Sequence, residues 1–425
     1  MQARAVLLAL VAGALALSAG SEPFVLALRG GLAPGDLAND FVAARELVAG
    51  RPLYTPAQGR MQAELVAAPE SVTPYYAHPP LVPLLLSPLV GLGFTGAAAL
   101  WWALSLWLLA MLGAIVVQEL HGPQPASLAL RLGALAGLLV WPPVLYNLDK
   151  GQWSILLAAL TAFGWRALAR GHAGRGGAWI GLACALKVTP GGFLPYLALR
   201  SRRGAAAAVG TLLACVGVSM VAVGPAGWAA FLRQGGRNVS AWEGWLSNTL
   251  SLNGFFARLL IGGRYETPLV HAPLAARAAF AGGGALLVAV ALRATWRTAW
   301  RTAWRPAGRT ASDTPREGAL FGLWAILVVL LNPLAWGHGA VMLLLPAALV
   351  VRCLAEDAQR HAAERRRLLA LMAAGILLVS IPIQTLHRAA GPVPVSPLGS
   401  LAVLSLPFYG VLLLFAAALA AIRRT

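Results

Sequence analysis

Long apolar stretches, separated by short basic connections, are the main pattern of this chain. Runs such as 97–118, 204–224 and 400–422 are rich in Leu, Ala and Gly and do not alternate between polar and apolar residues. About 20 apolar residues cross a bilayer core as a helix, whereas strands of a membrane barrel alternate. The pattern therefore predicts an all-α polytopic membrane protein with a single integral membrane domain over 1–425.

Basic residues predict the orientation of this domain. They gather in connections such as 166–175, 293–309 and 360–367, which fall on the same side if the N-terminus is inside. Because cytoplasmic connections carry the excess of Lys and Arg, we expect about ten spans with both termini cytoplasmic. The first run, 5–28, is interpreted as a span, although its "LALSAG" end is also typical of a cleavable signal peptide. The predicted spans are 5–28, 97–118, 127–146, 153–168, 204–224, 273–292, 318–334, 338–352, 368–384 and 400–422.

The segment 177–200 does not fit one ordinary crossing. Basic connections flank it on both sides, and its middle carries Lys187, Pro190 and two glycines, which interrupt a helix. We therefore expect a re-entrant helical hairpin that enters from the cytoplasmic side and returns. Lys187 then lies within the membrane region, where a cation needs either a structural partner or a phosphate.

The external side holds most of the polar variety. The first external loop is 29–78 and the second is 225–272. The first contains Asp36 and Asp40, four residues apart on one predicted helical face, in a chain with only 15 acidic residues. Asp36 suits a helix N-terminus, where a carboxylate complements the dipole, and it also suits a general base that accepts a proton from a hydroxyl group.

Aromatic side chains accompany the carboxylates. Tyr54, Tyr75 and Tyr76 precede the sequence "HPPLVPLLLSPL", in which the His is His78. Aromatic residues at a membrane boundary are commonly anchors, and they can also stack on sugar rings. Both interpretations stay open from the residues alone.

Composition excludes several classes of protein. Hydrophobic residues make up 59% of the chain and charged residues 11%, far below the quarter typical of soluble domains. The formal net charge of +18 lies in membrane-flanking connections, and no nucleic-acid-binding signature accompanies it. The three cysteines fall in apolar runs, which predicts neither a disulfide framework nor a metal site.

Several ordered segments together resemble the GT-C glycosyltransferases, and among them the polyprenol-phosphate-mannose-dependent mannosyltransferases of glycosyltransferase family 87. They extend from about Asp36 to His338. The family pattern DFxxYYxAAxxLLxG, counted back from Gly50, aligns its Asp with Asp36 and places Asp40 where an aromatic residue is common. The segments are "DLANDFVAARELVAGRPLY", "YYAHPPLVPLLLSPL", "GQWSILLAALTAFGWRALARG", "GLACALKVTPGGFLPYLALR", "SNTLSLNGFFARLL" and "NPLAWGH".

The resemblance implies a GT-C-like bundle in the plasma membrane, the inner membrane of a bacterium, with its active site on the external or periplasmic side. It implies inverting transfer of a sugar, mannose, from a polyprenyl-phosphate donor to a glycan or glycolipid acceptor, with no bound cofactor or metal. Asp36 would be the general base and Asp40 would bind the acceptor or assist the base. The residues expected at the donor phosphate or lipid are Lys187, Arg258, His338 and Gln152. Those expected at the substrates are Tyr54, Tyr75, Tyr76, His78, Asn248 and Trp336.

A transporter or flippase for a lipid-linked sugar is the alternative. It would also need a polar cavity and an intramembrane cation. The large external loops and the lack of a long internal repeat favour the enzyme.

Overall fold

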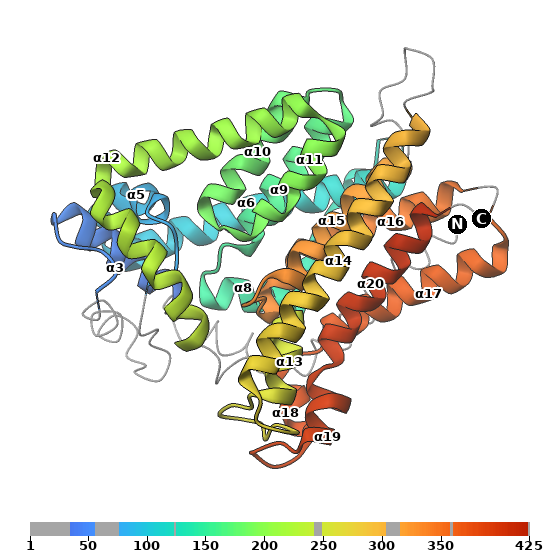
Figure 1. Ribbon diagram of the computed structural model, residues 1–425. Coiled ribbons are helices and arrows are strands. Elements are labelled where there is room, and N and C mark those ends of the chain that lie inside the picture. Colours follow the sequence, from blue (N-terminus) through green and yellow to red (C-terminus); the bar gives the residue numbers. More distant parts are fainter. Residues whose placement is uncertain are drawn as a thin grey trace.

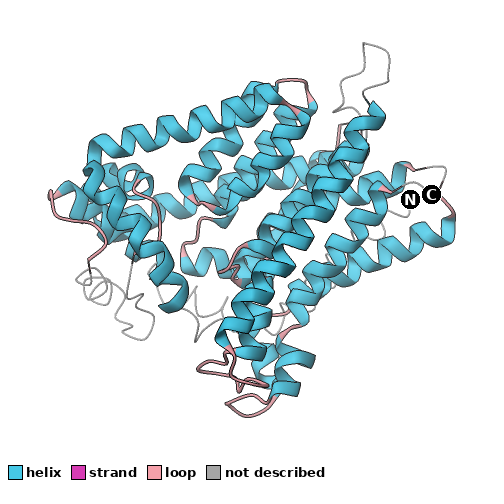
Figure 2. Ribbon diagram, in the orientation of Figure 1, coloured by secondary structure: helices cyan, strands magenta, loops and turns pink. Residues whose placement is uncertain are grey.

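The fold is known from a computed structural model, and its regular structure is helical (Figure 2). Among the described residues, β-structure is limited to two isolated bridges, Thr249 with Trp336 and Glu266 with Val395. The described residues are 35–55, 76–122, 125–241, 249–302, 315–357 and 360–423, and the side chains of 235–241 and 299–302 are not described.

The first part of the chain forms α3 and the helices up to α12 (Figure 1). Their bounds are α3 Gly35–Val48, α5 Leu81–Leu86, η2 Ser87–Leu92, α6 Gly93–His121, α7 Leu128–Leu139, α8 Pro142–Lys150, α9 Ser154–Ala169, α10 Ala173–Leu186, η3 Thr189–Phe193, α11 Leu194–Arg200 and α12 Arg202–Ala241. Helix α12 is interrupted by a kink at Gly224, which has a φ of 68° and is followed by Pro225.

The second part forms the helices from α13 to α20. Their bounds are α13 Leu252–Leu260, α14 Pro273–Thr302, α15 Pro315–Leu331, η6 Gly337–Leu343, α16 Leu344–Glu356, α17 Ala362–Val379, α18 Ile383–Ala390, α19 Pro397–Gly399, η7 Ser400–Leu404 and α20 Leu406–Ile422.

The helix α15 lies at the centre of the core. Every residue from Glu317 to Leu330 is buried, which fits a helix that is apolar on all sides. It packs against α16 and α20, and the ring of its Phe321 lies 5.2 Å from that of Trp165 in α9. The core is therefore assembled around one enclosed helix whose two ends open onto polar connections.

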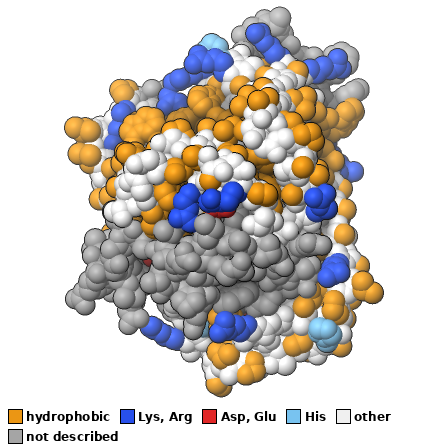
Figure 3. Space-filling model, turned by 90° about the vertical axis from the view of Figure 1, so that its left-hand side faces the viewer, with side chains coloured by type: hydrophobic (Ala, Val, Ile, Leu, Met, Phe, Trp, Pro, Cys, Tyr) orange, Lys and Arg blue, Asp and Glu red, His pale blue; other side chains and the backbone are white. Residues whose placement is uncertain are grey.

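Apolar side chains also cover much of the outside. On α12, Val209, Leu213, Val218 and Val221 are all exposed, which is costly in water and favourable in lipid. Figure 3 shows the side of the molecule on which α3 and α12 lie, with a broad apolar area and Lys and Arg side chains along its upper edge. These surfaces indicate a membrane protein.

Four described helical segments are long and apolar enough to cross a membrane, or up to seven if each bent pair is one span. The predicted count of about ten is not confirmed. One reason is that Pro and Gly divide several predicted runs: α7 and α8 meet at 65°, and α17 and α18 at 85°. Another is that α9 has only 16 residues, while the first predicted span, 5–28, lies outside the described residues.

The segment predicted as a hairpin goes in and returns. The start of α10 lies against the start of α12, so closely that a Cβ added at Gly177 would lie 1.9 Å from the carbonyl oxygen of Gly204. The intervening chain, α10, η3 and α11, therefore leaves and regains the same end of the bundle. Lys187 lies in the connection between α10 and η3.

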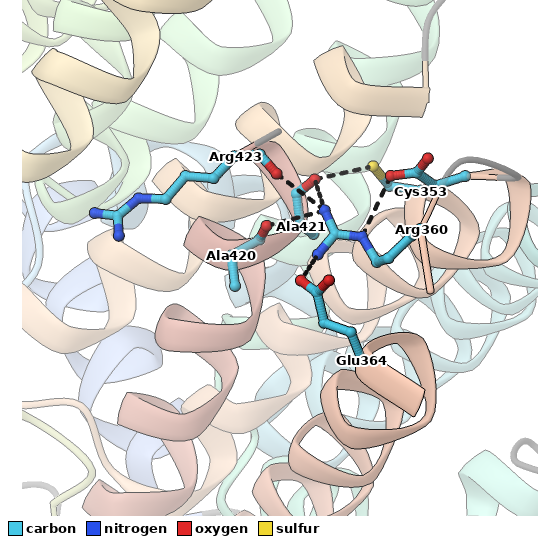
Figure 4. A network of polar contacts seen from close by, with 7 residues as sticks. Cys353, Arg360, Glu364, Ala420, Ala421 and Arg423 are labelled. Carbon is cyan, nitrogen blue, oxygen red and sulfur yellow. Dashed lines mark hydrogen bonds and ion pairs between the residues drawn. The ribbon is translucent and has the colours of Figure 1, made fainter. Parts of the chain in front are cut away.

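Polar connections gather at two opposite ends. At the basic end, Arg360 donates to Glu364 and to the terminal carbonyl groups of α20 at Ala420, Ala421 and Arg423 (Figure 4). This guanidinium group satisfies carbonyls that a helix C-terminus leaves without intrahelical partners. The opposite end holds the carboxylates of α3 and the connections that contact them.

Candidate active site

The carboxylates of Asp36 and Asp40, both on α3, contact the turn that directly follows α8. The first turn of α3 holds Asp36, and Asp40 lies one helical turn later, with an exposed fraction of 1%. Gln152 Nε2 donates to Asp36 Oδ2 at 2.5 Å, and Trp153 Nε1 donates to Asp40 Oδ2 at 2.7 Å. Two consecutive residues therefore hold the two carboxylates.

A left-handed glycine shapes this turn. Gly151 ends α8 with a φ of 67°, a conformation that residues with a Cβ adopt only at a cost. Asn147 then closes the turn, because its side chain donates to the carbonyl of Gln152 at 3.0 Å and accepts from the backbone of Ile155 at 3.3 Å. The backbone conformation at Gly151 thus directs the side chains of Gln152 and Trp153 towards α3.

A second connection reaches Asp40 from the end of the first loop. His78 Nδ1 donates to Asp40 Oδ1 at 2.6 Å, so both oxygens of this carboxylate are hydrogen bonded. The hydroxyl of Tyr54 donates to the backbone carbonyl of His78 at 2.9 Å, and the rings of Tyr54 and Tyr76 lie 5.5 Å apart. Tyr54 has a φ of 66°, which is unusual for a residue other than glycine and is held here by these contacts.

His338 approaches from the start of η6. Its side chain is buried, and its Nδ1 is hydrogen bonded to Ser154 Oγ at 2.8 Å. Its ring lies 5.6 Å from that of Tyr146 in α8. Trp336 lies two residues before His338 in the chain. It is half-buried, and its backbone forms an isolated β-bridge with that of Thr249.

Lys187 completes the cluster. It is half-buried and lies within electrostatic range of the Asp36 and Asp40 carboxylates. The imidazole of His338 also lies within electrostatic range of Lys187. Among the described residues, its ammonium group makes neither a hydrogen bond nor an ion pair within 4.0 Å. The cluster thus combines two carboxylates, two imidazoles and one ammonium group.

Burial changes the acid–base behaviour of Asp36. Its pKa is raised chiefly because the carboxylate is removed from water, and the nearby Asp40 raises it further. The Gln152 hydrogen bond and the charge of Lys150 oppose this rise. A carboxylate with a raised pKa accepts a proton more readily than an ordinary Asp.

The structure brings most of the predicted site residues together. Asp36, Asp40, Gln152, Lys187 and His338 meet in one cluster. Tyr54, Tyr76 and His78 line its side near Asp40. Arg258 is directed elsewhere: it donates hydrogen bonds to Ser405 Oγ and the carbonyl of Thr249, both at 3.2 Å, and Glu266 lies within electrostatic range. Tyr75 and Asn248 lie outside the described residues.

Sequence reasoning missed three residues of this cluster, Tyr146, Trp153 and Ser154. Trp153 and Ser154 directly follow the Gly-Gln pair in "GQWS", which was the available signal. Tyr146 carried no local signal, because its role depends on the tertiary approach of η6.

A cavity of about 220 Å³ adjoins the cluster. It shares Tyr146 with the site and is also lined by Gly337, the residue before His338. Its other walls are mostly apolar, with Asp149, Lys150 and Gln384 among its polar residues. In the described part of the chain, no group of three or more His, Cys, Asp or Glu side chains is placed to hold a metal ion.

The fold and the cluster define a helical membrane protein with a partly buried acid–base site. The sequence model of glycosyltransferase family 87 matches residues 76–312, more than half of the 425-residue chain. The chain belongs to this family and is a glycosyltransferase. The matched range includes His78, Gln152 and Lys187. No curated protein and no solved structure matches the chain.

Proposed function

We propose that this glycosyltransferase moves mannose from a polyprenyl-phosphate donor to a glycan or glycolipid acceptor, with inversion at the sugar carbon. The observation that carries this proposal is the position of Lys187, an ammonium group with no described ion-pair partner, beside the Asp36 and Asp40 carboxylates. A phosphate leaving group and an acceptor hydroxyl need a cation and a base in one place.

Asp36 is the general base in this proposal. Only its Oδ2 accepts a hydrogen bond from a described residue, so Oδ1 is available to an acceptor hydroxyl. Gln152 Oε1 is buried without a hydrogen-bond partner among the described residues, which suits a bond from a second hydroxyl of a sugar. Gln152 would then orient both the base and the substrate.

Asp40 has a different role, because its two oxygens are already occupied. It holds His78 through Nδ1 and so determines which ring nitrogen of His78 faces away from the carboxylate. We assign Asp40 to positioning rather than to direct contact with the acceptor.

The reaction proceeds in one displacement. The acceptor oxygen forms a bond to the anomeric carbon while its proton passes to Asp36. The bond between that carbon and the phosphate oxygen breaks, and its electron pair leaves with the polyprenyl phosphate. Lys187 neutralises the charge that develops on the phosphate, and its oxygens would also be bound by His78 and by His338, which lies within electrostatic range of Lys187 and His78.

The position of the site supports an external active site. The candidate site lies at the end of the bundle opposite the basic connections, so the positive-inside tendency places it on the external or periplasmic face of the plasma membrane. Both termini would be cytoplasmic.

Sugar transfer by the purified full-length protein in detergent tests this function. Radiolabelled polyprenyl-phosphate mannose, with native membrane extract as the acceptor source, should give labelled product, while GDP-mannose alone should give none. Asp36→Asn should abolish most of the transfer, and Asp357→Asn, a carboxylate at the basic end that pairs with Arg360, should retain it. Translocation of the labelled lipid without transfer would support a flippase instead.

A further inference from the structure

A buried ion pair joins α11 to α15 at the basic end of the bundle. Arg200 Nε donates to Glu317 Oε1 at 2.9 Å, and Arg200 Nη2 donates to Glu317 Oε2 at 2.7 Å. The exposed fractions of the two side chains are 8% and 5%. The hydroxyl of Tyr196, also on α11, donates to Glu317 Oε1 at 3.0 Å. One carboxylate therefore accepts three hydrogen bonds from one short helix.

The same helix leads back to Lys187. Between Lys187 and Arg200 the chain consists of η3, which packs on α15, and α11, which reaches α15 through the side chains of Tyr196 and Arg200. The ring of Phe193 stacks on Phe321 at 4.9 Å, and a Cβ added at Gly192 would lie 2.9 Å from a methyl group of Val328.

The partner helix leads to the other side of the candidate site. Glu317 lies near the start of α15, and the chain after the end of α15 at Leu331 continues directly to His338. The 14 residue-to-residue steps from Glu317 to Leu331 span about 21 Å of helix. Two antiparallel segments therefore connect the ion pair with the cluster. The first, η3 and α11, has Arg200 at one end and Lys187 at the other, and the second, α15, has Glu317 near one end and leads to His338 after the other.

The ion pair between Arg200 and Glu317 is directional, unlike the burial of apolar surface between the same segments. The hydrophobic driving force is not directional, so burial of apolar surface alone does not select one position of a segment along another. A bidentate guanidinium–carboxylate contact has one favourable geometry and resists both sliding and rotation. Any sliding of α11 along α15 moves Lys187 relative to His338 and to the carboxylates of α3.

We propose that Arg200 and Glu317 are positioning residues for sugar transfer, because their ion pair sets the depth at which Lys187 meets the phosphate of the donor. This inference rests on the proposed function of the cluster. It assigns a role in turnover to two side chains at the opposite end of the bundle, neither of which touches substrate.

A double-mutant cycle with Lys187 tests the proposal on the full-length protein, with transfer from radiolabelled polyprenyl-phosphate mannose as the readout. Glu317→Gln keeps the size of the side chain and removes its charge. It should lower kcat/KM by about ten- to hundredfold, since a displacement of about 1 Å at a reacting group can cost a hundredfold. In a Lys187→Ala background, the same substitution should cause no further loss, because its effect passes through Lys187.

Two milder variants keep the test valid if Glu317→Gln does not fold. Tyr196→Phe removes one hydrogen bond from the carboxylate, and Arg200→Lys keeps the charge but loses the bidentate contact. Both should reduce turnover in the wild-type background and leave it unchanged in the Lys187→Ala background. Glu364→Gln is the control, since it breaks the 2.6 Å contact to Arg360 at the same end of the bundle (Figure 4) and should keep normal turnover.

The outcomes separate this proposal from the proposed function. If Lys187→Ala loses turnover while Glu317→Gln keeps it, the positioning role is overturned and the role of Lys187 stands. Losses that multiply in the double variant show a general structural effect and also overturn the positioning role. Normal turnover in Lys187→Ala overturns both proposals.

Discussion

The Nδ1 atom of His78 and the Oδ1 atom of Asp40 lie 2.6 Å apart, and they join the end of the first loop to the helix α3. Since Trp153 occupies the other oxygen of Asp40, this carboxylate is enclosed by side chains of its own chain. Asp36, one helical turn earlier, keeps an oxygen that accepts no hydrogen bond from a described residue. Two carboxylates of one helical face therefore differ in their availability to a substrate.

Replacement of each carboxylate by its amide should reveal this difference. Asp36→Asn keeps the size and the ability to accept from Gln152 but removes the base, so turnover should fall at least roughly a hundredfold. Asp40→Asn should cost less, because it disturbs the position of His78 without removing the base. Steady-state sugar transfer measures both. A dead Asp40→Asn with an active Asp36→Asn would reverse the assignment.

The pH dependence of transfer should report Asp36. A general base acts only when deprotonated, so kcat/KM should fall as the pH falls through the pKa of Asp36. Burial raises this pKa, so the acid limb should lie above the ordinary Asp value of about 3.9. A pH profile of the full-length protein in detergent measures it.

Two neighbouring charges provide a check on this pH profile. Lys150 lowers the pKa of Asp36 and Asp40 raises it. Lys150→Met should therefore move the acid limb to higher pH, and Asp40→Asn should move it to lower pH. An acid limb that stays in place in both variants would show that another group titrates.

The turn at Gly151 should tolerate no Cβ. Its φ of 67° costs an L-residue about 1–2 kcal/mol, and a relaxed backbone would redirect Gln152 and Trp153 away from α3. Gly151→Ala should lower both the melting temperature and turnover. Gly282→Ala is a matched control within α14, where a Cβ meets no atom within 4 Å, and it should leave turnover unchanged. Equal effects of the two variants would contradict the role of the turn.

Site-directed labelling should determine the orientation in the membrane. In a background without the three native cysteines, His271→Cys lies in the predicted second external loop and His361→Cys in a predicted cytoplasmic connection. Both side chains are exposed. An impermeant maleimide should label the first in intact cells and the second only after permeabilisation. The opposite pattern would place the site inside.

Local features of the chain were predictable because they depend on neighbours in sequence. Apolar runs predict membrane helices, and a spacing of four places Asp36 and Asp40 on one helical face. Lys187 and Pro190 interrupt a helical pattern, and α10 ends at Leu186, directly before Lys187. The number of spans was less predictable, because short runs such as that of α9 carry the same composition whether they cross a membrane or pack inside the bundle.

The grouping of the site was decided by the tertiary structure. Its hydrogen bonds join residues 116, 113 and 184 positions apart: Gln152 with Asp36, Trp153 with Asp40, and His338 with Ser154. No local period specifies such pairs, because they depend on how helices pack. Helix packing also explains the position of Arg258. A guanidinium group suits a phosphate, but α13 directs this one to Ser405 and Thr249. The sequence by itself determined the membrane-embedded helices and the available chemical groups, and packing around α15 determined which of those groups meet.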